Sequence, residues 1–109
     1  MIDVAALNSG AKHFYRLILS KHPEWQAAVS LYHDLWPEHT HRPRGTLWLE
    51  LPVQNSDKTL TAYIQETEAL VEIEKKEQLF LWKPEECIDA CQAIMNCVER
   101  GVQTGKIRD

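Results

Sequence analysis

The sequence lacks the motifs that most directly reveal a chemistry. Its four glycines form no phosphate-binding loop, and neither a His-Glu-x-x-His motif nor a zinc-type cysteine pair occurs. No apolar run reaches about 18 residues, so no membrane-spanning helix is expected. The start, Met1-Ile2-Asp3-Val4, has no basic flank before an apolar core, which argues against a secretory signal. These absences favour a non-catalytic protein without a cofactor, a metal or a membrane partner.

An excess of basic charge is also missing. Twelve Lys and Arg residues against sixteen Asp and Glu residues give a net charge of -4 at pH 7. Nucleic-acid affinity depends mainly on basic side chains that displace counterions, so no nucleic-acid partner is expected. Three cysteines, Cys87, Cys91 and Cys97, fall in one predicted helix. This arrangement is a poor disulfide framework and favours a reducing, cytoplasmic location.

The middle of the chain has the apolar spacing of β-strands. We predict strands at 46–53, 60–64, 69–73 and 79–82. The apolar positions change from even to odd numbers between the second and third of these strands. A turn or bulge at 65–68 is therefore expected, so that both sets of side chains face one core.

Helices are predicted before this segment. Apolar residues recur at three- and four-residue steps from Val4 to Ile18, with Asp3 as the N-cap and Gly10 as a weak point where the helix breaks. Residues 23–36 fit a helix that begins at proline, but part of this stretch also alternates as a strand does. We favour the helix.

A further helix is predicted after the strands. It begins at Pro84 and ends near Gly101, and residues 104–109 are expected to form a frayed tail. Cys87 and Cys91 lie on its apolar stripe and are predicted to be buried, whereas Cys97 lies off the stripe and is predicted to be exposed.

The fold class that follows is α+β. Residues 1–109 are expected to form a single α+β domain, because 109 residues with 44% hydrophobic content suffice for one core. The predicted architecture is an antiparallel meander of three to four strands, with N-terminal helices and a C-terminal helix packed on the sheet.

One face of this sheet is predicted to carry acidic and aromatic side chains. Trp48 and Tyr63 have the parity opposite to the core positions, and Phe80 or Trp82 is expected to join them. The predicted partner-binding residues are Trp48, Tyr63, Glu66, Glu68, Glu72, Glu74 and Trp82. The leading hypothesis is therefore a cytoplasmic binding module, such as an inhibitor, an immunity-type neutraliser or an adaptor, that engages a protein with a basic surface.

The alternative hypothesis involves the loop at 37–45, which has two prolines and a glycine. It is a small-molecule- or metal-binding protein, or an enzyme, and its ligand-binding residues would be His33, His39, His41, Arg42 and Arg44. The favoured interpretation of the histidines is a solvated loop without a metal, with the two arginines paired to Glu38 or Glu50. A third hypothesis is a homodimer whose exposed sheet pairs with itself.

Overall fold

The computed structural model describes residues 2–107, which form a five-stranded sheet and its covering helices. The helices are η1 (Val4–Ala6), α1 (Ser9–Lys21), η2 (Pro23–Ala28), α2 (Tyr32–Leu35), η3 (Pro84–Glu86) and α3 (Cys87–Thr104). The strands are β1 (Val29–Leu31), β2 (Leu47–Pro52), β3 (Thr59–Ile64), β4 (Glu68–Ile73) and β5 (Lys76–Leu81).

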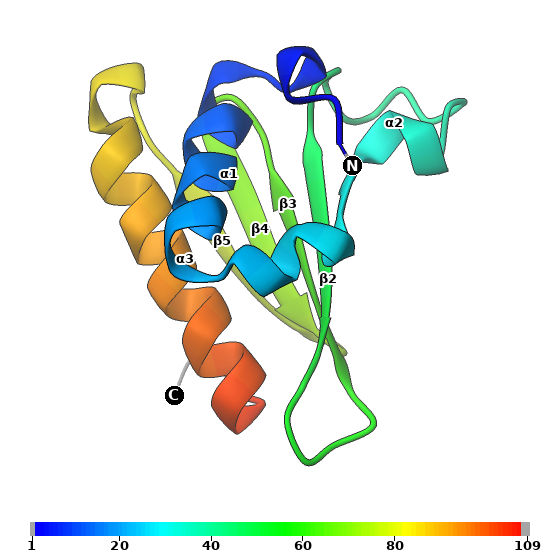
Figure 1. Ribbon diagram of the computed structural model, residues 1–109, viewed down its shortest axis with the longest axis vertical. Helices are drawn as coiled ribbons and strands as arrows, with labels where there is room; N and C mark the ends of the chain where they lie inside the picture. The colour runs from blue at the N-terminus through cyan, green and yellow to red at the C-terminus, as the bar shows by residue number, and fades with distance from the viewer. Residues whose placement is uncertain (1, 108–109) are drawn as a thin grey trace.

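All neighbouring strands are antiparallel and follow one another in chain order from β1 to β5. Helices α1 and α3 lie side by side across one face of the sheet (Figure 1). The α+β prediction is confirmed. The predicted number of three to four strands is too low, because β1 adds a fifth strand at the edge beside β2.

The stretch 23–36, where helix and strand competed, contains both. The chain forms the 3-10 helix η2, then the three residues of β1, then the single turn of α2. Val29 pairs with Leu49 and Leu31 with Leu47. The backbone N–H of Tyr32 donates to the carbonyl of Thr46 at 2.9 Å, which ends the pairing. The predicted continuous helix is wrong, because residues 29–31 pair with β2 and therefore form a strand.

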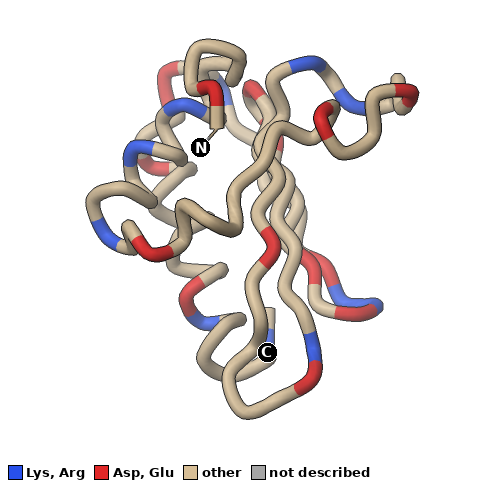
Figure 2. Tube along the Cα trace, turned by 45° about the vertical axis from the view of Figure 1, so that its right-hand side comes forward, with Lys and Arg blue, Asp and Glu red and all other residues tan. Residues whose placement is uncertain are grey.

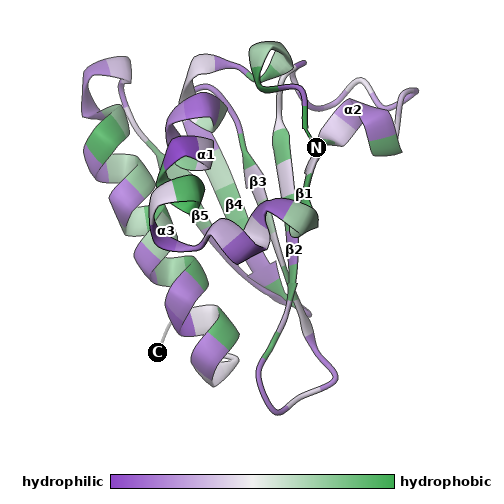
Figure 3. Cartoon of the chain, in the orientation of Figure 1, coloured by the Kyte–Doolittle hydropathy of each residue, from purple (hydrophilic) through white to green (hydrophobic). Residues whose placement is uncertain are grey.

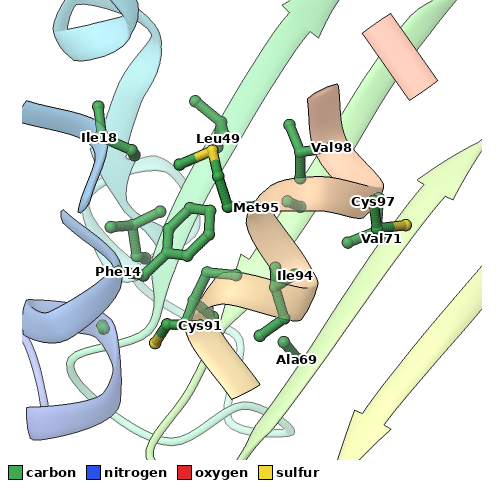
Figure 4. Packing of buried hydrophobic residues seen from close by; sticks show 14 of the residues in the cluster. Phe14, Ile18, Leu49, Ala69, Val71, Cys91, Ile94, Met95, Cys97 and Val98 are labelled. Atoms are coloured by element: carbon green, nitrogen blue, oxygen red, sulfur yellow. The ribbon is translucent and has the colours of Figure 1, made fainter. Parts of the chain in front are cut away.

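The core lies between the sheet and the two long helices. Phe14 and Ile18 from α1 meet Ile94, Met95 and Val98 from α3, above Leu49 and Val71 of the sheet (Figure 4). Apolar and polar residues recur in turn along α1 and α3, which is the pattern of an amphipathic helix (Figure 3). Burial of these apolar side chains is the main force that holds the helices on the sheet.

The predicted change of parity is confirmed. Leu60, Ala62 and Ile64 of β3 and the odd-numbered apolar residues of β4 are all buried on the helix side. A turn at 65–67 absorbs the shift, and the N–H of Gln65 donates to the carbonyl of Glu68 at 2.8 Å. A slip of one residue would instead have turned the apolar set of one strand to the opposite face.

The first helix breaks earlier than predicted. Asp3 caps only η1, and the side chain of Asn8 caps α1 by accepting from the N–H of Ala11 at 2.9 Å. Gly10 lies inside α1, against the carbonyls of Gln65 and Glu66. Because Gly10 has no side chain, α1 can approach the β3–β4 turn closely. Gly10 does not break the helix.

The C-terminal helix also differs in detail. It continues through Gly101, which packs against Leu60, and ends at Thr104, followed by Gly105 with a φ of 74°. The expected frayed tail is wrong for Ile107, which is 1% exposed; residues 108–109 lie outside the described part. Cys97 is buried, contrary to the prediction. No helix in residues 2–107 has the length and apolar character needed to cross a membrane.

Gly10→Ala should destabilise the protein markedly. A Cβ at this position would lie 2.3 Å and 2.4 Å from the carbonyl oxygens of Gln65 and Glu66, so the backbone must move. We expect the free energy of unfolding to fall by about 1–3 kcal/mol in urea denaturation. The control is Gly101→Ala, whose Cβ meets mainly the flexible end of Leu60 and should cost less. Equal urea midpoints for Gly10→Ala and the wild type would contradict the close contact between Gly10 and the β3–β4 turn.

Candidate functional site

The sheet face opposite α1 and α3 is largely uncovered (Figure 1). We call it the open face, and it is formed by Trp48, Glu50, Thr61, Tyr63, Glu68, Leu70, Glu72, Glu77, Leu79 and Leu81. Leu79 and Leu81 are 50% and 69% exposed. Single exposed leucines are ordinary on a protein surface, but here they continue a larger apolar patch.

An apolar row crosses four strands of the open face. Trp48 is directly opposite Tyr63, Tyr63 is opposite Leu70, and Leu70 is opposite Leu79. The rings of Trp48 and Tyr63 meet edge to face, with centroids 5.1 Å apart. Such cross-strand neighbours contact one another on one side of the sheet. The row therefore presents a continuous band of large apolar side chains.

An acidic row runs beside it. Strand register places Glu50 opposite Thr61, Thr61 opposite Glu72, and Glu72 opposite Glu77. Acidic positions outnumber basic ones along the strands, and two lysines lie around the β4–β5 turn (Figure 2). In the part of the chain that the structure describes, no lysine or arginine forms an ion pair with these glutamates. Directly opposed like charges destabilise a sheet, so the Glu72–Glu77 pair has no benefit for folding.

The segment after β1 folds over one end of the apolar row. Tyr32 is 4% exposed, and Trp36 meets Trp48 with ring centroids 4.5 Å apart. The loop returns to the body at Gly45, whose φ is 85° and whose carbonyl accepts the N–H of Asn8 at 3.1 Å. A Cβ at Gly45 would lie 2.6 Å from that nitrogen, so this close approach favours glycine.

Two loop histidines converge on one buried phenol. The Tyr32 Oη lies 2.9 Å from His39 Nδ1 and 3.2 Å from His41 Nε2. The phenol has one proton to donate, so one imidazole accepts this proton while the other donates its N–H to the oxygen. His33 holds the backbone of the same loop, because its Nε2 donates to the carbonyl of His39 at 2.8 Å.

Arg42 stacks on the aromatic row. Its guanidinium carbon lies 3.9 Å from the centroid of the Tyr63 ring and 5.4 Å from that of Tyr32. Its Nε is buried and has no hydrogen-bond partner among the described residues. The predicted ion pair with Glu38 or Glu50 does not form, because the guanidinium packs on the rings instead.

Tyr63 links this stack to the acidic row. Its hydroxyl donates to Glu72 Oε1 at 3.0 Å. Burial and, secondly, the charge of Glu72 raise the pKa of Tyr63 from 10.0 to about 12. The phenol therefore remains a hydrogen-bond donor at neutral pH and holds Glu72 in place.

The predicted partner-binding residues divide into two groups. Trp48, Tyr63, Glu68 and Glu72 lie on the open face as expected. The predicted position is wrong for Glu66, Glu74 and Trp82. The carboxylate of Glu66 accepts from the N–H and hydroxyl of Ser9 at the start of α1, and Glu74 occupies the β4–β5 turn with a φ of 54°.

Trp82 faces the core, where it is 9% exposed. The register explains this position, because Phe80 lies opposite the buried Ala69 and Trp82 follows with the same parity. Leu79 and Leu81 consequently take the places on the open face that we expected an aromatic residue of this strand to fill. Residues 79–82 are an unbroken apolar run, which predicts a strand but does not tell which of its side chains face the core.

The loop residues do not remain separate from the sheet. His39, His41 and Arg42 pack against Tyr32 and Tyr63, whereas Arg44 is exposed. Within residues 2–107, no group of three or more His, Cys, Asp or Glu side chains gathers as metal ligands do. The two candidate surfaces of the sequence analysis are therefore parts of one surface, joined by Tyr32 and Tyr63.

The cysteine thiols lie away from this surface and are buried. Burial and, to a lesser extent, the neighbouring Cys87 raise the pKa of Cys91 from 9.0 to about 12. Burial also raises the pKa of Cys97. Because the thiolate is the nucleophilic form, these environments keep both thiols unreactive at neutral pH.

Comparisons of this chain with protein-family models, with curated proteins and with solved structures found no match.

Tyr63→Phe should remove the component of the phenol titration that occurs at the highest pH. The pKa of Tyr63 is raised from 10.0 to about 12, so the folded protein holds this proton more tightly than the unfolded chain does. The stabilisation that Tyr63 contributes should therefore fall as the pH rises through this interval. Ultraviolet absorbance of the phenolate, followed in the wild type and in Tyr63→Phe, measures this component.

The matched variant is Glu72→Gln, which keeps the burial of Tyr63 but removes the charge. In this variant the Tyr63 phenol should titrate at lower pH, because the charge and hydrogen bond of Glu72 raise the pKa of Tyr63. Identical titrations of wild type and Tyr63→Phe would contradict the described environment.

Proposed function

We propose that this chain is a non-catalytic, cytoplasmic protein-binding module that engages its partner through the open face. Such a module would act as an inhibitor, an immunity-type neutraliser or an adaptor. The observation that carries the proposal is the pairing of an apolar row with an adjacent acidic row on the side of the sheet away from α1 and α3, where the segment after β1 covers only one end of the apolar row.

The apolar row supplies the anchors. Trp48 and Tyr63 are partly exposed, and Leu79 is 50% exposed at the other end of the row. Aromatic side chains that fill a partner's pocket contribute most of the binding energy in many interfaces. A groove of about 530 Å³ beside Trp48 and Glu50, also lined by Leu35, extends this surface toward β1. A partner's side chain entering the groove would contact an indole and a carboxylate together.

The acidic row selects the partner. Glu72 and Glu77 face each other without a cation of their own chain among the described residues. A lysine or arginine of another protein, placed between the two carboxylates, would convert this repulsion into attraction. Complementary charge of this kind accelerates association and excludes acidic partners. The proposed partner is thus a protein whose contact surface combines basic side chains with apolar ones.

Glu77→Lys should stabilise the isolated protein. The substitution places a cation opposite Glu72, so a repulsive cross-strand pair becomes an attractive one. The expected gain in the free energy of unfolding is about 0.2–1 kcal/mol at low ionic strength, and salt should reduce it. Glu38→Lys, in the exposed loop, makes the same change in net charge and is the control for urea denaturation. The proposal loses its main support if Glu77→Lys and Glu38→Lys raise the free energy of unfolding equally.

The double variant Glu72→Lys/Glu77→Lys should fold normally but bind slowly. It exchanges one like-charge pair for another but loses the hydrogen bond from Tyr63 to Glu72, so the melting temperature should fall only slightly. The association rate with the native partner should fall by about tenfold or more at low salt, and its salt dependence should diminish. The partner would be captured with the wild-type chain, identified by mass spectrometry and purified, and its binding followed by surface plasmon resonance.

A double variant with the same charge change elsewhere, Glu38→Lys/Asp57→Lys, tests whether position matters. Its association rate should fall much less, because both residues lie in exposed loops and neither belongs to the acidic row. Equal slowing of both double variants would show that net charge alone steers the encounter. A captured protein that binds the open-face double variant at the wild-type rate would refute the proposed surface.

A further inference from the structure

We propose that Tyr32, His39 and His41 form a binding site for a divalent first-row transition metal, Cu²⁺ or Zn²⁺. The site lies at the end of the open face, but the proposal is independent of the partner protein. It rests on the convergence of three potential ligand atoms, one phenol oxygen and two imidazole nitrogens, at a single point of the loop.

The spacing of the donor atoms suits a metal. His39 Nδ1 and His41 Nε2 lie 2.9 Å and 3.2 Å from Tyr32 Oη. Donors that each lie about 2.0–2.1 Å from a Zn²⁺ ion stand roughly this far apart in tetrahedral or octahedral sites. Both distances from the phenol oxygen to the imidazoles therefore match those of ligands that share a metal, and the exposed imidazoles would turn to place both nitrogens on it.

The exchange of charge also balances. A divalent cation would replace the phenol proton, which passes to solvent, and Tyr32 would bind as phenolate. The histidine that accepts the phenol proton already has its own proton on the nitrogen that points away from the metal, and the histidine that donates to the phenol would move its proton to that nitrogen by exchange with solvent. The phenolate would offset the repulsion between the metal and the Arg42 guanidinium, which lies 5.4 Å from the Tyr32 ring.

The neighbouring residues hold these ligands in place. Tyr32 is fixed by burial, and its N–H is tied to the Thr46 carbonyl. The hydrogen bond from His33 fixes the backbone of His39, while the Trp36 ring lies parallel to the His39 ring, 4° between their planes. Surrounding contacts of this kind orient metal ligands and sustain affinity.

The ligand set limits the choice of metal. Two imidazoles and one phenolate combine nitrogen and oxygen donors, which suit Cu²⁺ and Zn²⁺ better than Ca²⁺ or Mg²⁺. Both histidines are exposed, so water can complete the coordination. Cu²⁺ should bind more tightly than Zn²⁺, following the general order of affinities.

Titration of the tag-free protein with Cu²⁺ tests the site. Binding of one equivalent should produce the visible charge-transfer absorption of a phenolate bound to Cu²⁺, and Zn²⁺ in excess should weaken it. Tyr32→Phe should abolish this absorption while two imidazoles still retain some Cu²⁺. His39→Ala/His41→Ala should abolish both the absorption and the stoichiometric binding.

Two further variants separate a metal site from a structural cluster. His33→Ala removes the hydrogen bond that holds His39 and should weaken Cu²⁺ binding by about tenfold. His13→Ala, on α1 and away from the loop, should leave binding unchanged. Circular dichroism establishes that each variant is folded. The proposal is overturned if the wild type shows no phenolate absorption, or if Cu²⁺ binds the folded His39→Ala/His41→Ala variant as tightly as it binds the wild type.

Discussion

The register of the antiparallel sheet is the constraint on which the rest of the structure depends. Every strand alternates, and the turns keep those alternations in phase from β2 to β5, so one set of side chains meets α1 and α3. The other set is thereby forced onto a single uncovered side. Because side-chain direction has a period of two, the phase that builds the core also builds the apolar and acidic rows. The core and the open face are two results of the same pairing.

The sequence pattern predicted the features that depend on residues close together in the chain. The alternation around Leu47–Pro52 and the parity change before Ala69 were sufficient to place strands and the turn between them. They could not reveal β1, since three residues become a strand only when β2 is beside them. Trp82 was assigned to the wrong face because its phase depends on pairing with β4. Likewise, no spacing rule brings Tyr32 under His41, since the fold of the loop creates this contact.

The open face departs from what stability alone would select. This side holds an opposed pair of glutamates, two exposed leucines and an arginine whose buried Nε has no partner among the described residues. Proteins tend to break the rules of local consistency where they function. The loop above Tyr63 belongs to the same region, so the binding of a protein and of a metal ion would each affect the other through shared side chains.

The hydrogen bond between Gly45 and Asn8 couples this region to the long helix. Asn8 caps α1 with its side chain and gives its N–H to the carbonyl at the end of the loop. Lifting the loop would therefore disturb the first turn of α1, on the far side of the sheet. If the proposed surface binds a partner, its occupancy and the fraying of that turn would be linked equilibria, and the strands would not have to rearrange.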